Sequence, residues 1–161
     1  MSAFGLSKQL GINRNQAAEY IDTYLKRYPG VKISMDKTRQ LAARQGYVET
    51  HFGRRLYLPE INSSNGMRRQ AAERTAINAP MQGTAADVIK LAMISVDNWL
   101  ENSEMKSGII MQVHDELVLE VFENELTTVI EQLQKRMSNA ADLRIPLVVD
   151  VGVGENWEEA H

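Results

Sequence analysis

The sequence predicts an α+β fold in which helices pack on a small antiparallel sheet. Two observations indicate this class: apolar residues recur at helical spacing in several segments, and two short segments have hairpin patterns. A further observation is the order of the expected elements along the 161 residues, which is helices, hairpin, helices, hairpin, helix and strand. Such an order is typical of α+β domains with an antiparallel sheet. The length suits one domain or a piece of a larger protein.

The first third of the chain is expected to form helices followed by a hairpin. Asn13 and Gln16 have the spacing of a capping box, and apolar residues then recur at helical spacing as far as Tyr28. Another helix is expected over residues 31–45, with Gly46 as its C-terminal stop. Tyr47 to His51 and Arg55 to Leu58 then flank a turn, so a short hairpin is expected there.

The rest of the chain is expected to contain two helices, a second hairpin, a helix and a last strand. After a turn-rich loop at residues 58–66, residues 66–79 favour a helix. Pro80 is expected to end that helix or to begin the next, because it lacks an N–H and disfavours helical geometry at the preceding residue. The remaining elements are expected at residues 80–100 (helix), 109–113 and 117–121 (strands), 123–140 (helix) and 147–151 (strand).

The composition excludes several kinds of site. Cysteine is absent, which excludes disulfides, thiolate zinc sites, iron–sulfur clusters and cysteine nucleophiles. No stretch is apolar for long enough to span a membrane, and the first residues lack the basic and apolar regions of an export signal. We therefore expect a cytoplasmic protein without a membrane partner.

Charge is divided unevenly along the chain. Residues 1–96 carry 14 Lys and Arg against 7 Asp and Glu, whereas residues 97–161 carry 4 against 14. This division suggests that the first part holds a polyanion. Two solvated helix surfaces of opposite charge would explain the same numbers.

The most distinctive chemical feature is a cluster of ionisable residues between two apolar segments. His114, Asp115 and Glu116 lie at the bend of the second expected hairpin. Carboxylate oxygens suit Mg²⁺, which typically takes one or two protein carboxylates together with water and substrate phosphates. Asp115 is therefore the leading candidate ligand for a metal. The alternative is that the residues simply suit a solvated turn, where Asp is common.

A second candidate site is a row of hydrogen-bond donors. Arg74, Asn78 and Gln82 are spaced four residues apart, so they would share one helix face if the helix continued past Pro80. Donors on long side chains suit sugars, phosphates and minor-groove acceptors. An ordinary solvated helix face is the alternative.

A third candidate site is a group of arginines near the first hairpin. Arg54 and Arg55 lie at its turn and in its second arm, and three more arginines follow within the next 19 residues. The planar guanidinium group binds phosphate well, so the group predicts a nucleic-acid contact. Arginines are also common on helix surfaces without any ligand.

Taken together, the segments closely resemble the C-terminal end of the family A DNA polymerases. The resemblance covers essentially the whole chain and is carried by SAFGL, RYPGV, GYVET, GRRLYLP, AAER, INAPMQGTAAD, QVHDELV and GENW. The segment QVHDE matches motif C of the family. Single-subunit RNA polymerases share a related His-Asp hairpin, but INAPMQGTAAD and GENW favour the DNA polymerases.

This resemblance implies an activity and roles for the candidate residues. The activity is template-directed addition of deoxynucleotides to a primer 3′ end with two Mg²⁺ ions, and the partners are primer-template DNA and deoxynucleoside triphosphates. Asp115 matches the metal-binding aspartate of motif C. Glu116 matches the neighbour of that aspartate, which has a lesser role in the family. His114 matches a residue that lies near the primer terminus. Arg74, Asn78 and Gln82 match family positions that contact the primer-template or support the newly forming base pair.

The resemblance also implies that the chain is a fragment. Residues 1–63 would be the remainder of the fingers subdomain and residues 64–161 the C-terminal palm. The motif A aspartate and the triphosphate-binding motif of the fingers have no counterpart in this sequence, so the isolated chain is expected to be inactive. The alternative function is a nucleic-acid-binding module without catalytic activity.

Overall fold

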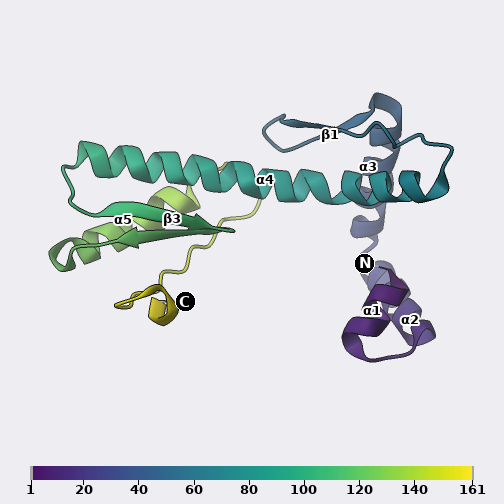
Figure 1. Cartoon of the computed structure of the whole chain (residues 1–161), viewed down its shortest axis with the longest axis horizontal. Coiled ribbons are helices and arrows are strands. Elements are labelled where there is room, and N and C mark those ends of the chain that lie inside the picture. The colour runs from purple at the N-terminus through teal and green to yellow at the C-terminus, as the bar shows by residue number, and fades with distance from the viewer. Residues whose placement is uncertain (1, 161) are drawn as a thin grey trace. The chain divides into compact units, whose positions relative to one another are not determined.

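The computed structural model describes residues 2–160 and divides into two compact units, one up to Pro80 and one from Met81 onward. The α+β class is confirmed, with two separate two-stranded antiparallel sheets among helices (Figure 1). In chain order the elements are α1 (Ala3–Leu10), α2 (Arg14–Arg27), α3 (Pro29–Gln45), β1 (Tyr47–Glu49), β2 (Arg55–Tyr57), α4 (Gly66–Asn102), β3 (Gly108–Val113), β4 (Glu116–Glu120), the 3₁₀ turn η1 (Glu123–Glu125), α5 (Leu126–Ser138) and α6 (Trp157–Ala160). In the described part of the chain, no helix is both long and apolar enough to cross a membrane.

The helix ends in the first unit follow local sequence signals. The Asn13 side chain accepts a hydrogen bond from the Gln16 amide, and the Gln16 side chain accepts one from the Asn13 amide, which confirms the capping box of α2. Gly46 ends α3 with a φ of 78°, a left-handed conformation that glycine adopts without steric cost. The chain can therefore turn directly from α3 into β1.

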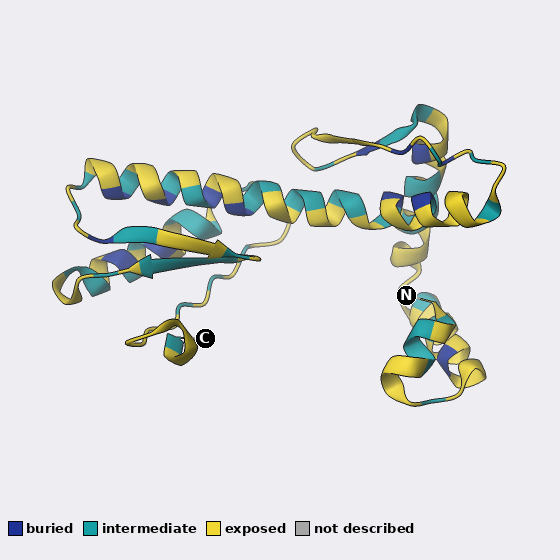
Figure 2. Ribbon diagram, in the orientation of Figure 1, coloured by how far each residue is buried: buried dark blue, intermediate teal, exposed yellow. Residues whose placement is uncertain are grey.

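The core of the first unit joins α3, the first hairpin and the start of α4. Its buried members are small or β-branched, apart from one leucine; they are Ala42, Val48, Leu58, Ile61, Ala72 and Ala76. Figure 2 shows the buried positions of the chain in dark blue. Val48 lies on β1, whose register with β2 pairs it with Leu56. The hairpin is thus fixed to α4 through buried contacts.

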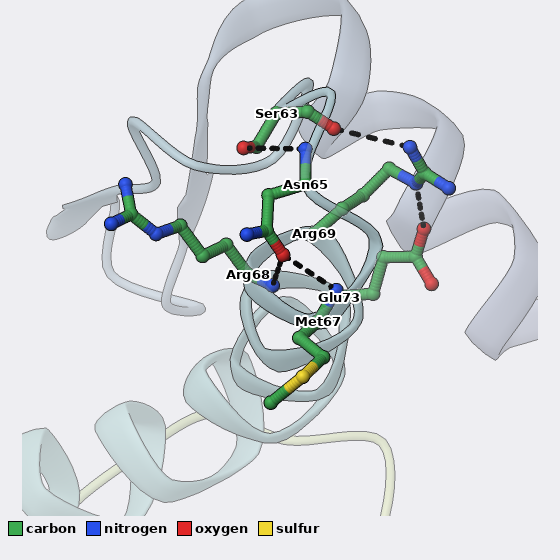
Figure 3. Close-up of polar contacts among 6 residues, drawn as sticks. All are labelled: Ser63, Asn65, Met67, Arg68, Arg69 and Glu73. Atoms are coloured by element: carbon green, nitrogen blue, oxygen red, sulfur yellow. Dashed lines mark hydrogen bonds and ion pairs between the residues drawn. The ribbon is translucent and has the colours of Figure 1, made fainter.

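The first turn of α4 is tied to the loop before it. The Asn65 side chain accepts hydrogen bonds from the amides of Met67 and Arg68 at 3.0 and 3.3 Å, which satisfies two donors that a helix start leaves unpaired (Figure 3). Arg69 donates to the carbonyl of Ser63 at 3.1 Å and lies 3.9 Å from the carboxylate of Glu73. The loop expected at residues 58–66 therefore ends in a fixed conformation at the helix.

The expected interruption at Pro80 is wrong. One helix, α4, runs through it for 37 residues. An interior proline removes one backbone hydrogen bond and crowds the carbonyl four residues earlier, at a typical cost of about 3 kcal/mol. Helix-forming residues on both sides of Pro80 and the burial of Ala76 offset that cost. The local rule fails because the flanking helical segments are long and well packed.

The second unit packs the β3–β4 hairpin against two helices. Val96 and Leu100 of α4 and Val129 and Leu133 of α5 form its buried centre. The partly buried residues packed against that centre include, from the hairpin, Ile109, Leu117 and Leu119. The register breaks between Ile109 and Met111, a bulge that leaves the intervening Ile110 63% exposed. One face of the hairpin is therefore fixed by the core, and its loop projects from that support.

The strand expected at residues 147–151 does not form. Exposure still alternates there as in a strand, since Leu147, Val149 and Val151 are half-buried while Val148 and Asp150 are exposed. In the described part of the chain, however, no strand pairs with this segment. Together with β4 and α5 it lines an open cavity of about 980 Å³. A strand pattern in the sequence is not sufficient, because a strand also needs a hydrogen-bonding partner.

The last residues fold back on themselves with little space. A Cβ atom on Gly152 would overlap the carbonyl oxygen of Ala160, and one on Gly154 would lie 2.6 Å from the Cβ of Glu159. The Asn156 side chain accepts a hydrogen bond from the Glu159 amide at 3.1 Å and so caps α6. A side chain at either position would therefore force residues 159–160 to move.

We predict that acid destabilises the second unit through Glu125. Its carboxylate accepts hydrogen bonds from the Ser107 hydroxyl at 2.6 Å and from the amides of Lys106 and Ser107 at 3.2 and 3.0 Å. Hydrogen bonding by the Ser107 hydroxyl is the largest cause that lowers the pKa of Glu125 below its ordinary value. Glu125 therefore stabilises the folded protein fully at a pH above its pKa in the unfolded chain, which is about 4.3. This stabilisation is lost as the pH falls through the lower pKa that Glu125 has in the folded protein.

The measurement is urea unfolding from about pH 5 to about pH 3. The unfolding midpoint of the wild type should fall more steeply than that of Glu125→Gln, which has no carboxylate to protonate. Parallel pH dependences for the two proteins would show that Glu125 has no such role.

Candidate metal-binding hairpin and nucleic-acid contacts

The candidate metal ligand lies in a two-residue hairpin loop. Val113 pairs with Glu116 as the last pair of the β3–β4 ladder, so His114 and Asp115 form the loop. Both side chains are exposed, and Glu116 is half-buried. Because the strands below are fixed by the core of the second unit, the carboxylate of Asp115 is presented to solvent from a supported position.

The loop has an unusual backbone conformation. His114 has a φ of 52°, in the left-handed region that only a few per cent of non-glycine residues adopt, histidine, asparagine and aspartate more often than the others. The left-handed conformation costs an L-residue about 1–2 kcal/mol. A positive φ at the first loop residue alone is the sign pattern of a type II′ turn, in which glycine usually occupies that position. Such strain is often found at functional sites.

The residues at this loop fit a magnesium ion that is shared with a substrate. Asp115 and Glu116 are adjacent and offer hard oxygen ligands. Among the described residues, 2–160, no group of three or more His, Asp or Glu side chains is arranged to hold a metal. A closed protein site is therefore absent from that range, whereas an open one, in which water and phosphate supply most ligands, suits Mg²⁺.

The donor row lies on α4, with two members in the first unit. Arg74 and Asn78 are exposed and one helical turn apart, while Ala72 and Ala76 of the same helix are buried. Gln82 is also exposed on α4 and belongs to the second unit. The helical path that this row requires is present, since α4 is continuous through Pro80.

Arg54 and Arg55 lie in the first hairpin, and Arg55 has a fixed orientation. Its guanidinium group forms an ion pair with Glu49 at 2.7 Å and lies 4.6 Å from the ring centre of Tyr47. Hydrogen bonding to Glu49 is the largest cause that raises the pKa of Arg55 above its ordinary value. Arg54 is exposed in the loop just before β2. Part of the charge of Arg55 is thus compensated within the hairpin.

The charge division in the sequence follows the two units closely. Residues 1–80 carry 13 Lys and Arg against 6 Asp and Glu, and residues 81–161 carry 5 against 15. The exposed arginines of the first unit therefore lie in a basic part of the chain, which favours contact with phosphate groups. Asp115 and Glu116 lie in the acidic part.

Sequence reasoning gave no role to one residue that contacts the loop. The Gln112 side chain donates a hydrogen bond from Nε2 to the carbonyl oxygen of His114 at 2.8 Å. The sequence feature that could have indicated this role is the amide side chain of Gln112, which stands in an otherwise apolar strand two residues before the bend. Polar residues in such strands often hydrogen-bond to nearby backbone.

Comparison with known proteins points to one family. The family model described as DNA polymerase family A matches residues 1–159. DNA polymerase I of Pseudomonas aeruginosa is 63% identical over 161 residues, and that of Streptococcus pneumoniae is 48% identical over 160 residues. These matches cover 100% and 99% of this chain but only 18% of each relative, so the chain spans less than a fifth of their length.

A solved structure is also similar over nearly the whole chain. It is the polymerase domain of Pol1 from M. smegmatis in complex with DNA primer-template and dNTP, with a TM-score of 0.94 and 45% sequence identity. The match covers 99% of this chain and 28% of that one. Fold and sequence thus agree over the same residues.

Proposed function

The chain belongs to DNA polymerase family A, and we propose that it forms part of the active site of a DNA-directed DNA polymerase in DNA replication and repair. The observation that carries this proposal is the exposed carboxylate of Asp115 on a hairpin fixed by the core. Residues 1–63 would complete the fingers and residues 64–161 the palm. The similar Pol1 structure, which contains primer-template and dNTP, supports these partners.

The residues of the hairpin would hold the metal. Asp115 would bind Mg²⁺ directly, with Glu116 beside it in a lesser role. When bound there, Mg²⁺ would supply positive charge that neutralises the triphosphate and makes the primer hydroxyl more acidic. A two-metal mechanism needs carboxylates from a second segment of the polypeptide. Asp115 therefore supplies one part of such a site.

The donors would position the DNA. Arg74, Asn78 and Gln82 would donate hydrogen bonds to sugar, phosphate and minor-groove acceptors, contacts that fix the duplex with little dependence on its sequence. His114 would lie near the primer terminus, and Arg54 and Arg55 would contact phosphate. Duplex contacts that do not depend on base sequence suit a polymerase, because it must copy every sequence.

The test is primer extension by two proteins. One is the isolated chain, and the other is P. aeruginosa DNA polymerase I in which this chain replaces the matching 18%. We expect template-dependent extension by the chimera within about tenfold of the parent rate and only background extension by the isolated chain. A folded chimera that binds primer-template without extending it would contradict the proposal. Extension by the isolated chain near the parent rate would contradict the expected need for a second carboxylate segment.

A second candidate function is DNA binding without catalysis. The basic first unit favours it, since phosphate contacts alone give salt-dependent affinity. Binding of primer-template by the isolated chain at low salt, combined with an inactive chimera, would favour this alternative. An active chimera would exclude it as the main function.

A further inference from the structure

The peptide bond before Asp115 is held by a side chain that has no role in the proposed function. The Gln112 amide group donates to the carbonyl oxygen of His114, and this carbonyl belongs to the peptide bond that joins His114 to Asp115. Gln112 pairs with Leu117 in the β3–β4 ladder and precedes His114, the first residue of the loop, by two positions. Its side chain is exposed, so packing in the core does not account for its orientation.

The contact acts at the strained point of the loop. His114 adopts a φ of 52°, and in the described part of the chain Glu104 is the one other non-glycine residue with a positive φ. A residue in this region keeps its conformation when the surrounding structure holds it there. The Cα atom of Asp115 lies in the plane of the His114–Asp115 peptide, so the orientation of this plane, together with the φ of Asp115, determines the direction in which the Asp115 side chain leaves the backbone. The hydrogen bond from Gln112 therefore acts on the orientation of the carboxylate.

We propose that Gln112 is a positioning residue for Asp115. Its amide group holds the His114 carbonyl, keeps the loop in the conformation with positive φ, and so fixes the carboxylate in the direction that binds the cation. The part of this inference that concerns the cation rests on the proposed function. The part that concerns the loop does not. Groups that orient a metal ligand through hydrogen bonds commonly change metal affinity by about 10–100-fold when removed.

The test uses the whole 161-residue chain and Mn²⁺ as the probe. Gln112→Met keeps the length of the side chain but removes its donor, and Gln134→Met is the matched control, because Gln134 is exposed on α5. Paramagnetic broadening of the Asp115 amide signal reports Mn²⁺ binding. We expect an apparent dissociation constant about tenfold higher in Gln112→Met, no change in Gln134→Met, and the same thermal midpoint in all three proteins.

Two further measurements separate the parts of the inference. The three-bond coupling between the His114 amide and α protons reports its φ, and it should change in Gln112→Met but not in Gln134→Met. In the wild type, the Nε2 protons of Gln112 should exchange with water more slowly than those of Gln134, a result that needs no variant to fold.

The outcomes are distinct. An unchanged His114 coupling in Gln112→Met, equal exchange of the two side-chain amides, or an unchanged Mn²⁺ affinity would overturn the positioning role. If the wild-type Asp115 signal does not respond to Mn²⁺, the part of the inference that concerns the cation is wrong for this chain, while primer extension by the chimera decides the proposed function separately. The His114 coupling then still decides whether Gln112 fixes the loop.

Discussion

Replacing Asp115 with asparagine in the active chimera is expected to lower the rate of primer extension at least about 10³-fold. Metal binding at a phosphoryl-transfer site is worth several kcal/mol of transition-state stabilisation, and each 1.36 kcal/mol corresponds to a factor of ten. Asparagine keeps the size of the side chain but removes the negative charge that a hard cation requires. The measurement is single-turnover extension of a labelled primer with saturating Mg²⁺.

The control for Asp115→Asn is Asp97→Asn. Asp97 is exposed on α4 in the same unit, so its replacement removes the same charge from a position outside the candidate site. We expect the control to keep the chimera rate and both variants to bind primer-template. A rate for Asp115→Asn similar to that of the control would exclude Asp115 as a metal ligand.

Replacing Val129 with aspartate is expected to unfold the second unit. Val129 is 1% exposed and packs with Val96, Leu100 and Leu133. A carboxylate there would lose its hydration without gaining a partner, and the aliphatic contacts would be lost as well. We expect a loss of at least about 4 kcal/mol, a large fraction of the stability of a small domain. Urea unfolding and amide exchange in β3 and β4 measure it.

The neighbouring variant Thr128→Asp separates burial from charge. Thr128 is exposed on the same helix, so the added carboxylate stays hydrated. The expected change is within about 0.5 kcal/mol. Equal destabilisation by the two variants would show that charge on α5, rather than the core, decides the result.

Features of the fold that depend on neighbouring residues were predictable from the sequence. The capping box of Asn13 and Gln16, the stop at Gly46 and both hairpins formed as expected, because their chemistry is complete within a few residues. Pro80 and residues 147–151 did not follow expectation. Whether a helix survives a proline, or an extended segment becomes a strand, depends on packing and partners far away in the sequence.

The candidate site was predictable in its residues but not in its geometry. Apolar arms around His114, Asp115 and Glu116 were enough to place them at a bend. The positive φ of His114 and the hydrogen bond from Gln112 could not be read from residue types, because even histidine, which is enriched in the left-handed region, adopts a positive φ in only a minority of cases.

The close approach at Gly152 and Gly154 affects how sequence variation in this chain should be interpreted. A side chain at either position would displace the α6 turn, so we expect a saturation mutagenesis screen to score both sites as poorly tolerant. Their invariance in such a screen would reflect steric exclusion at the tail of the chain and should not be taken as evidence that these glycines touch nucleotide or DNA.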